Sequence, residues 1–223
     1  MARVLVILSG CGVYDGSEIH ESVITLLHLD RHNASVTFAA PDGDQMDVVN
    51  HLTARPTDET RNMRAESARI ARGPVEDLAQ IRGGDFDALF MPGGFGAAKN
   101  LCDFAVRGAE CEVHREVARV LREAHDAGRP IGLCCIAPTI GAKLFPGVTL
   151  TVGLDPATAQ AIEAMGARHE SRPTEQACVD KTHRIVTTPA YMTAERIGQV
   201  DAGIGVLVDE VMALAAQPAA AAE

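Results

Sequence analysis

Two adjacent cysteines, Cys134 and Cys135, stand between an apolar run and the segment Ile136-Ala137-Pro138. Pro138 suits the first turn of a helix, where the amide hydrogen that proline lacks would have no partner. The pattern predicts a strand-to-helix elbow, in which the turn residue projects its side chain over the edge of a sheet. Such an elbow needs a small residue two positions after the nucleophile, and Ala137 meets this need for Cys135. Cys134 has bulky Ile136 there, so we predict Cys135 as the nucleophile; the alternative is two buried cysteines that pack like small hydrophobic residues.

Cys135 would lie at the N-terminus of a helix, where backbone amides favour a thiolate over a thiol and so increase its nucleophilicity. Covalent chemistry also requires hydrogen-bond donors for the negative charge that develops on a substrate. The backbone amides of Gly94 and Ile136 are candidates, because the Gly93-Gly94 turn has no side chains that prevent close approach. Each such donor typically contributes about 3 kcal/mol of transition-state stabilisation. A double glycine also suits any tight turn, so this hypothesis depends on the elbow.

Glu18 and Glu21 lie three residues apart at the predicted start of a helix, so both carboxylates are expected on one face of it. If that face meets the elbow, either carboxylate could move protons during chemistry at Cys135. The simpler interpretation is a pair of ordinary acids that the helix N-terminus stabilises. The presence of the elbow favours the catalytic interpretation.

The loop over residues 10–16 supports a different hypothesis. Glycines at positions 10, 12 and 16 follow a strand and precede a helix, which resembles a variant of the dinucleotide-binding fingerprint. Asp42 would then be the acid that binds the ribose. However, Asp15 lies within the loop and would repel a pyrophosphate, so we expect no bound nucleotide.

Cys111 and His114 have the spacing of two zinc ligands, but no second pair follows at the distance that a zinc site needs. We therefore expect both residues to be structural, and we predict no metal site.

Composition narrows the class of protein. The net charge of −10 argues against binding to nucleic acids, whose phosphate backbone normally requires a basic surface. No apolar run approaches the ~18 residues of a membrane span, so no membrane association is expected. Six cysteines in 223 residues do not form the dense framework of a small secreted protein, which predicts a reducing, cytoplasmic location. The apolar run at residues 4–8 is interpreted as a first strand rather than as a signal peptide.

Strands alternate with helices along most of the chain, which predicts a mainly parallel sheet with helices on both faces. Ligands of such sheets bind outside the carboxyl ends of the strands, where the glycine loop, the glycine turn and the cysteine elbow all fall. We predict one domain over residues 1–216 and a disordered tail at 217–223. Expected strands cover residues 3–9, 35–39, 86–91, 131–134 and 148–152, expected helices cover 18–29, 57–72, 111–127, 156–165 and 193–216, and a hairpin covers 178–187.

Several motifs resemble those of the PfpI-like superfamily, which includes glyoxalase III enzymes and class I glutamine amidotransferase domains. Phe90-Met91-Pro92-Gly93-Gly94 is similar to its glycine turn, and Cys135-Ile136-Ala137-Pro138-Thr139 is similar to its cysteine elbow. Residues 7–21, 48–53 and 187–192 more closely resemble the enhancing lycopene biosynthesis proteins, a glyoxalase-like bacterial group with mitochondrial relatives and a name that refers to isoprenoid biosynthesis.

The resemblance implies an α/β fold of the flavodoxin-like type, a three-layer sandwich, in a homodimer that needs no cofactor. By motif, Cys135 matches the nucleophile of the superfamily, and Glu21 matches the glutamate that hydrogen-bonds it; Glu18 is the second choice. Many members have histidine where this chain has Ile136, which argues against protease-like hydrolysis. The later histidines, His169 and His183, lie in segments that are typical of a strand and a hairpin turn, which argues against glutaminase activity.

Together these observations predict a cofactor-independent glyoxalase, a lyase that acts on a small dicarbonyl substrate. Cys135 would add to glyoxal, and possibly methylglyoxal, to form a hemithioacetal that rearranges to the 2-hydroxy acid. The alternative is a redox-sensing or regulatory protein with an activated cysteine and little turnover.

Overall fold

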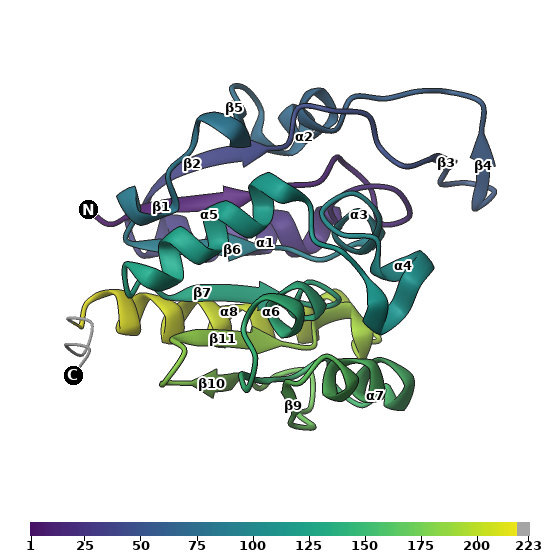
Figure 1. Cartoon of the computed structure of the whole chain (residues 1–223). Coiled ribbons are helices and arrows are strands. Elements are labelled where there is room, and N and C mark those ends of the chain that lie inside the picture. Colours follow the sequence, from purple (N-terminus) through teal and green to yellow (C-terminus); the bar gives the residue numbers. More distant parts are fainter. Residues whose placement is uncertain (218–223) are drawn as a thin grey trace.

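A seven-stranded sheet forms the centre of the computed structural model, which describes residues 1–217 (Figure 1). The strand order is β10-β11-β7-β6-β1-β2-β5, and every neighbouring pair is parallel except β10 and β11. β6 and β7 are buried along their whole length, as expected for parallel strands that are covered on both faces. The strands are β1 (Arg3–Ile7), β2 (Ser35–Ala40), β5 (Glu76–Asp77), β6 (Ala88–Met91), β7 (Ile131–Cys134), β10 (Cys178–Asp180) and β11 (Ile185–Thr188).

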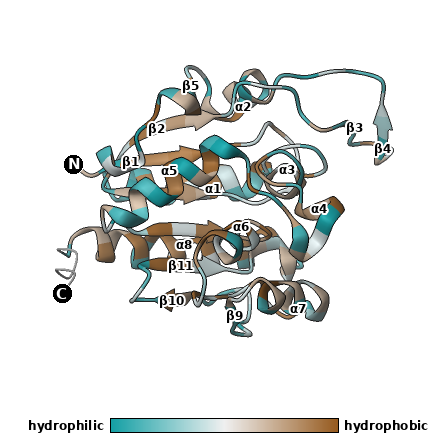
Figure 2. Cartoon of the chain, viewed as in Figure 1, coloured by the Kyte–Doolittle hydropathy of each residue, from teal (hydrophilic) through white to brown (hydrophobic). Residues whose placement is uncertain are grey.

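Helices cover both faces of this sheet and divide the core into two layers. On one face, α1 (Ile19–Arg31) and α8 (Ile197–Ala215) pack on alternate strand residues such as Val4 and Val6. On the other face, α5 (Arg115–Asp126) and α6 (Pro138–Leu144) pack on the intervening residues such as Leu5 and Ile7. Figure 2 shows that hydrophobic residues predominate along the central strands. The predicted flavodoxin-like α/β fold is confirmed.

Smaller elements complete the fold around the sheet. An antiparallel hairpin extends away from the central sheet in Figure 1, and a short parallel pair lies beside α7. The hairpin strands are β3 (Val48–Asn50) and β4 (Arg55–Thr57), the parallel pair is β8 (Thr149–Leu150) and β9 (Arg168–His169), the remaining α-helices are α2 (Met63–Ala71), α3 (Phe95–Lys99), α4 (Phe104–Arg107) and α7 (Pro156–Ala164), and the 3-10 helices are η1 (Leu78–Gln80), η2 (Gly83–Asp85), η3 (Gly108–Glu110) and η4 (Ala190–Met192).

Several predicted boundaries were wrong. The helix expected over 57–72 begins only at Met63, because Asn62 caps it by accepting a hydrogen bond from the Ala65 amide. The helix expected from residue 111 begins at Arg115 for the same reason, with His114 as its cap. The expected strand at 148–152 is short and lies outside the main sheet. Among residues 1–217, no helix is long and apolar enough to span a membrane. The predicted tail beyond residue 217 lies outside the described residues.

Candidate active site

Cys135 lies in a strained turn between β7 and α6. Its φ of 60° is in the left-handed region, which residues other than glycine rarely adopt and which costs about 1–3 kcal/mol. The Cys135 amide donates to the Thr188 carbonyl oxygen of β11 at 3.0 Å, and the Ala137 amide donates back to Cys134 at 3.1 Å. These bonds hold the turn in place, and the structure thus has the elbow that the sequence predicts.

The two neighbouring cysteines differ in their surroundings. Cys134 is the last residue of β7 and packs in the core layer below α1 and α8, where 1% of it is exposed. Cys135 is 8% exposed and lines a cavity at the carboxyl edge of the sheet. Only Cys135 therefore has contact with a space that a substrate can enter.

Glu21 is the carboxylate in direct contact with Cys135. It is fully buried on α1, and its two oxygens accept hydrogen bonds from the backbone amides of Gly93 at 2.9 Å and Tyr191 at 3.2 Å. Burial, followed by the nearby charge of Glu18, raises the pKa of Glu21 to about 7, although the two amides and the Cys135 thiol favour the charged form. Glu21 can therefore both accept and release a proton near neutral pH.

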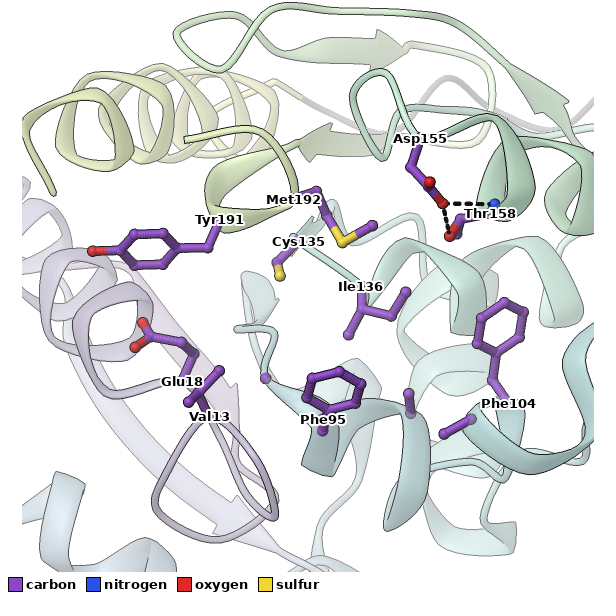
Figure 3. A pocket seen from close by; sticks show the side chains of 13 residues that line it. Val13, Glu18, Phe95, Phe104, Cys135, Ile136, Asp155, Thr158, Tyr191 and Met192 are labelled. Atoms are coloured by element: carbon purple, nitrogen blue, oxygen red, sulfur yellow. Dashed lines mark hydrogen bonds between the residues drawn. The ribbon is translucent and has the colours of Figure 1, made fainter. Parts of the chain in front are cut away.

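Glu18 has a different role in the structure. It precedes α1 as its N-cap, and its side chain accepts a hydrogen bond from the Glu21 amide at 2.7 Å. The same side chain lines the cavity (Figure 3). Glu18 thus fixes the first turn of the helix that carries Glu21, and it presents negative charge to the cavity.

The thiol of Cys135 is not an isolated thiolate. Burial and then the Glu21 carboxylate raise its pKa well above the ordinary value, and the backbone amides of Gly94 and Ile136, which hydrogen-bond to the sulfur, oppose this only in part. The prediction of a lowered pKa was wrong, because the helix-start amides compete with a neighbouring anion and with desolvation. The two amides predicted as oxyanion donors do converge on Cys135, and its thiol donates to Glu21.

The glycine turn before α3 is shaped by close contacts. A Cβ atom on Gly93 would lie 2.4 Å from the Cys135 Cβ and 2.7 Å from the Glu21 Oε2, so no other residue fits there. Gly94 has a φ of 92°, and a Cβ atom on it would lie 2.4 Å from the Gly16 carbonyl oxygen. The double glycine therefore allows the cysteine and the glutamate to meet.

The cavity above Cys135 has a volume of about 490 Å³ (Figure 3). Sequence reasoning missed most of its walls, because they come from α3, α4, η4 and the start of α7, which are distant in sequence. Phe95 alone carried a signal, since it directly follows the glycine turn. The lining residues are Val13, Glu18, Gly94, Phe95, Ala98, Phe104, Ala105, Cys135, Ile136, Asp155, Thr158, Tyr191 and Met192.

In the loop over residues 10–16, the amides of all three glycines already donate to protein acceptors. The Gly10 amide donates to the Ser67 hydroxyl, the Gly12 amide to the Ser17 carbonyl oxygen, and the Gly16 amide to the Gly12 carbonyl oxygen. Asp42, the suggested ribose acid, instead binds Asn62 and Arg64. This geometry does not fit the dinucleotide hypothesis.

Cys111 and His114 each have a structural role and do not face a common metal site. The Cys111 thiol is in contact with Cys102 and Met165, whereas His114 caps α5. Within residues 1–217, no cluster of three or more histidine, cysteine or acidic side chains could hold a metal ion.

Glu21 should lower the stability of the protein at neutral pH. Its pKa rises from 4.5 to about 7 on folding, so between these values the folded protein binds a proton that the unfolded chain has released. The free energy of unfolding therefore falls as the pH rises through this window, by about 3 kcal/mol in total. We expect the difference in the free energy of unfolding between Glu21→Gln and wild type, measured by urea unfolding, to shift by about that amount in favour of the variant from pH 4.5 to pH 8. The exposed Glu112→Gln variant is the control, and a difference from wild type that does not change with pH would contradict the expectation.

Comparisons with known proteins give close relatives. No family model matches the chain. A human protein, glutamine amidotransferase-like class 1 domain-containing protein 3, mitochondrial, is 49% identical over 96% of this chain and 83% of its own length. The zebrafish (Danio rerio) ES1 protein, mitochondrial, is 36% identical over 96% of this chain and 87% of its own length.

Solved structures agree with the fold. An isoprenoid biosynthesis protein with an amidotransferase-like domain from Ehrlichia chaffeensis superposes with a TM-score of 0.88, at 37% identity, over 95% of this chain and 99% of its own. Glyoxalase III from Candida albicans has a TM-score of 0.61 over 96% of this chain and 97% of its own, but at 14% identity this likeness concerns the fold alone.

The predicted cytoplasmic location is corrected by these relatives. The curated proteins from human, rat and zebrafish are all named as mitochondrial, which points away from the cytoplasm. The cysteine count could not make this distinction, because it addresses only whether a compartment favours disulfides.

Proposed function

The chain belongs to the family of ES1 proteins and glutamine amidotransferase-like class 1 domain-containing proteins, and from this starting point we propose that it is a cofactor-independent glyoxalase. The substrate is glyoxal or methylglyoxal, and the product is the 2-hydroxy acid. The contact between the buried Glu21 carboxylate and the Cys135 thiol, at the base of an open cavity, is the observation that carries the proposal.

The first step is addition of the thiol to an aldehyde. Glu21 accepts the proton of Cys135 while the sulfur bonds to the aldehyde carbon, so no free thiolate needs to accumulate. The carbonyl oxygen takes up the electron pair, and the amides of Gly94 and Ile136 stabilise it until Glu21 passes the thiol proton to it, which restores the Glu21 carboxylate. The result is a hemithioacetal on Cys135.

The second step is an internal oxidation and reduction. Glu21 removes the proton from the carbon bonded to sulfur and returns a proton to the neighbouring carbon through an enediol. The first carbon is thereby oxidised to a thioester and the second is reduced to an alcohol. Water then cleaves the carbon–sulfur bond, so that one dicarbonyl and one water give one 2-hydroxy acid. The raised pKa of Glu21 suits this role, because a base with a pKa near the working pH is the most effective.

Hydrolysis of amides is a poorer fit. Cysteine-dependent amide hydrolysis normally uses a histidine to protonate the departing amine, and the residue after Cys135 is Ile136 rather than histidine. His169 lies on β9 and His183 pairs with Asp180 at 2.9 Å, at the β10–β11 turn. Neither histidine lines the cavity.

A redox sensor is also a poorer fit than an enzyme. Sensor cysteines are exposed and have a low pKa. Cys135 is only 8% exposed, and its pKa is raised. The predicted homodimer and the closer likeness to enhancing lycopene biosynthesis proteins remain predictions.

The test is whether the purified protein converts glyoxal to glycolate in a buffer without glutathione or other thiols. We expect glycolate to form in proportion to the enzyme concentration, as followed by ¹³C NMR of labelled glyoxal. If glyoxal is consumed no faster than in buffer alone, the proposal is wrong.

A further inference from the structure

The cavity is far larger than the substrates considered so far. Its volume of about 490 Å³ falls within the range of sites that enclose a drug-sized molecule. Glyoxal consists of two linked carbonyl groups and nothing else. Bound to Cys135, it would reach only the end of the cavity near Glu18 and Tyr191 and leave most of the space filled by water.

The walls beyond that end are mainly apolar. Phe95, Phe104 and Met192 surround the space that leads away from the Cys135 sulfur (Figure 3). Phe95 is 48% exposed although it borders the cavity, so a ligand there would cover a large apolar side chain. Burial of apolar ligand surface against such walls is favourable, at roughly 25 cal/mol per Å².

The charges of the cavity are all of one sign. Glu18 lines the end near the sulfur, and Asp155 lines the opposite end. The lining residues include no lysine, arginine or histidine within the described part of the chain. Lys99 lies 5.6 Å from the centre of the Phe95 ring, and its ammonium group is held by Asp47 at 2.9 Å. An anionic substrate would therefore be repelled at both ends without a cation to bind it.

The Asp155 carboxylate has a fixed position. One of its oxygens accepts hydrogen bonds from the amide and the hydroxyl of Thr158, which makes Asp155 the N-cap of α7. Because α7 holds the residue, its charge stays at the far end of the cavity, where it would oppose an anionic tail.

From size, apolarity and charge together, we infer that the preferred substrate is an uncharged 2-oxoaldehyde with a bulky apolar group on its ketone carbon, which the enzyme converts faster than glyoxal. This inference rests on the proposed function. The aldehyde carbon bonds to Cys135, and the apolar group packs against Phe95, Phe104 and Met192. The chemistry is unchanged: the aldehyde is oxidised, the ketone is reduced, and one water is added.

The test compares substrates that differ in one property at a time. Phenylglyoxal should have a kcat/KM at least about tenfold above that of glyoxal, in line with the 10–200-fold that one added methylene contributes in a hydrophobic pocket. Uncharged 4-methylphenylglyoxal should be preferred over anionic 4-carboxyphenylglyoxal by a similar factor. Equal or higher kcat/KM for glyoxal, or no preference by charge, would overturn the inference. Cys135→Ser protein supplies the background that arises from reaction with arginines.

Variants locate the effect in the cavity. Phe104→Ala and the milder Phe104→Leu should both lower the ratio of kcat/KM for phenylglyoxal to that for glyoxal, whereas Val106→Ala, a 71% exposed neighbour on α4, should not. Asp155→Asn keeps a good N-cap but removes the charge, so it should narrow the preference for the uncharged arylglyoxal. Ratios that do not change in the Phe104 and Asp155 variants would overturn the assigned binding mode.

Failure of the proposed reaction can be distinguished from failure of the substrate class. If no 2-oxoaldehyde is converted in a Cys135-dependent way, the proposed function is wrong. Calorimetry on Cys135→Ser protein then compares 2-hydroxyacetophenone with hydroxyacetone, two uncharged ketones that differ in the phenyl group. Tighter binding of the phenyl compound supports the inferred ligand class, and equal or undetectable binding contradicts it.

Discussion

Replacement of Cys135 by serine is expected to lower kcat/KM for glyoxal by at least about 10³-fold. Serine has nearly the same size and fits the elbow, but its hydroxyl is a much weaker nucleophile at neutral pH. Glu21 and the amides of Gly94 and Ile136 would remain in place. The loss therefore reports on the sulfur itself, and it is measured by initial rates of glycolate formation.

Cys134→Ala is the matched control for that variant. Cys134 is buried in the core layer below α1 and does not line the cavity, although its sulfur lies 3.8 Å from the Glu21 Oε2. We expect this variant to retain activity within about tenfold of wild type, since it removes a small apolar contact. A larger loss of activity in Cys134→Ala than in Cys135→Ser would show that Cys135 is not the nucleophile.

Glu21→Gln should lower kcat by about 10²–10⁴-fold, the usual contribution of a general acid–base group. Glutamine keeps an acceptor for the Gly93 or Tyr191 amide but cannot take the proton of Cys135. In wild type, kcat/KM should fall about tenfold per unit as the pH drops below 7, because the Glu21 pKa is about 7 and the base must be deprotonated. The variant should lack this limb of the pH profile. A profile that is unchanged by the substitution would show that another group titrates.

Glu18→Gln separates the two glutamates. Its side chain caps α1 through the Glu21 amide, and glutamine caps a helix less well. We expect a smaller fall in kcat than for Glu21→Gln and an acidic limb that persists. If Glu18→Gln removed the limb and Glu21→Gln did not, the roles of the two residues would be exchanged.

The elbow could be predicted from the sequence because it depends on local rules, whereas the choice of Glu21 over Glu18 as its partner came from the resemblance to the PfpI-like superfamily. A strand that leads into Ala137-Pro138 has few conformations available, and Glu21 comes from the first helix after the first strand of the same sheet. The convergence of the Gly94 and Ile136 amides follows from two turns at adjacent strand ends, β6 and β7.

Other properties depend on contacts that no local pattern encodes. The pKa of Cys135 is a balance between two amides, burial and one carboxylate, and its direction is decided by tertiary distances. The cavity walls come from α4, α7 and η4, which the sequence distributes over about ninety residues between Phe104 and Met192. Asp155 illustrates the difficulty, since it caps α7 next to Pro156 and only the fold brings its charge to the cavity.

The most direct test of the central claim is to find the substrate covalently bound to Cys135. Wild-type protein is mixed with glyoxal, quenched in acid during turnover, digested and analysed by tandem mass spectrometry. We predict a mass increase equal to one glyoxal on the Cys135 side chain, as the glycolyl thioester, and none on Cys134. Turnover without any such adduct on Cys135, or an adduct on Cys134 in its place, would contradict the mechanism.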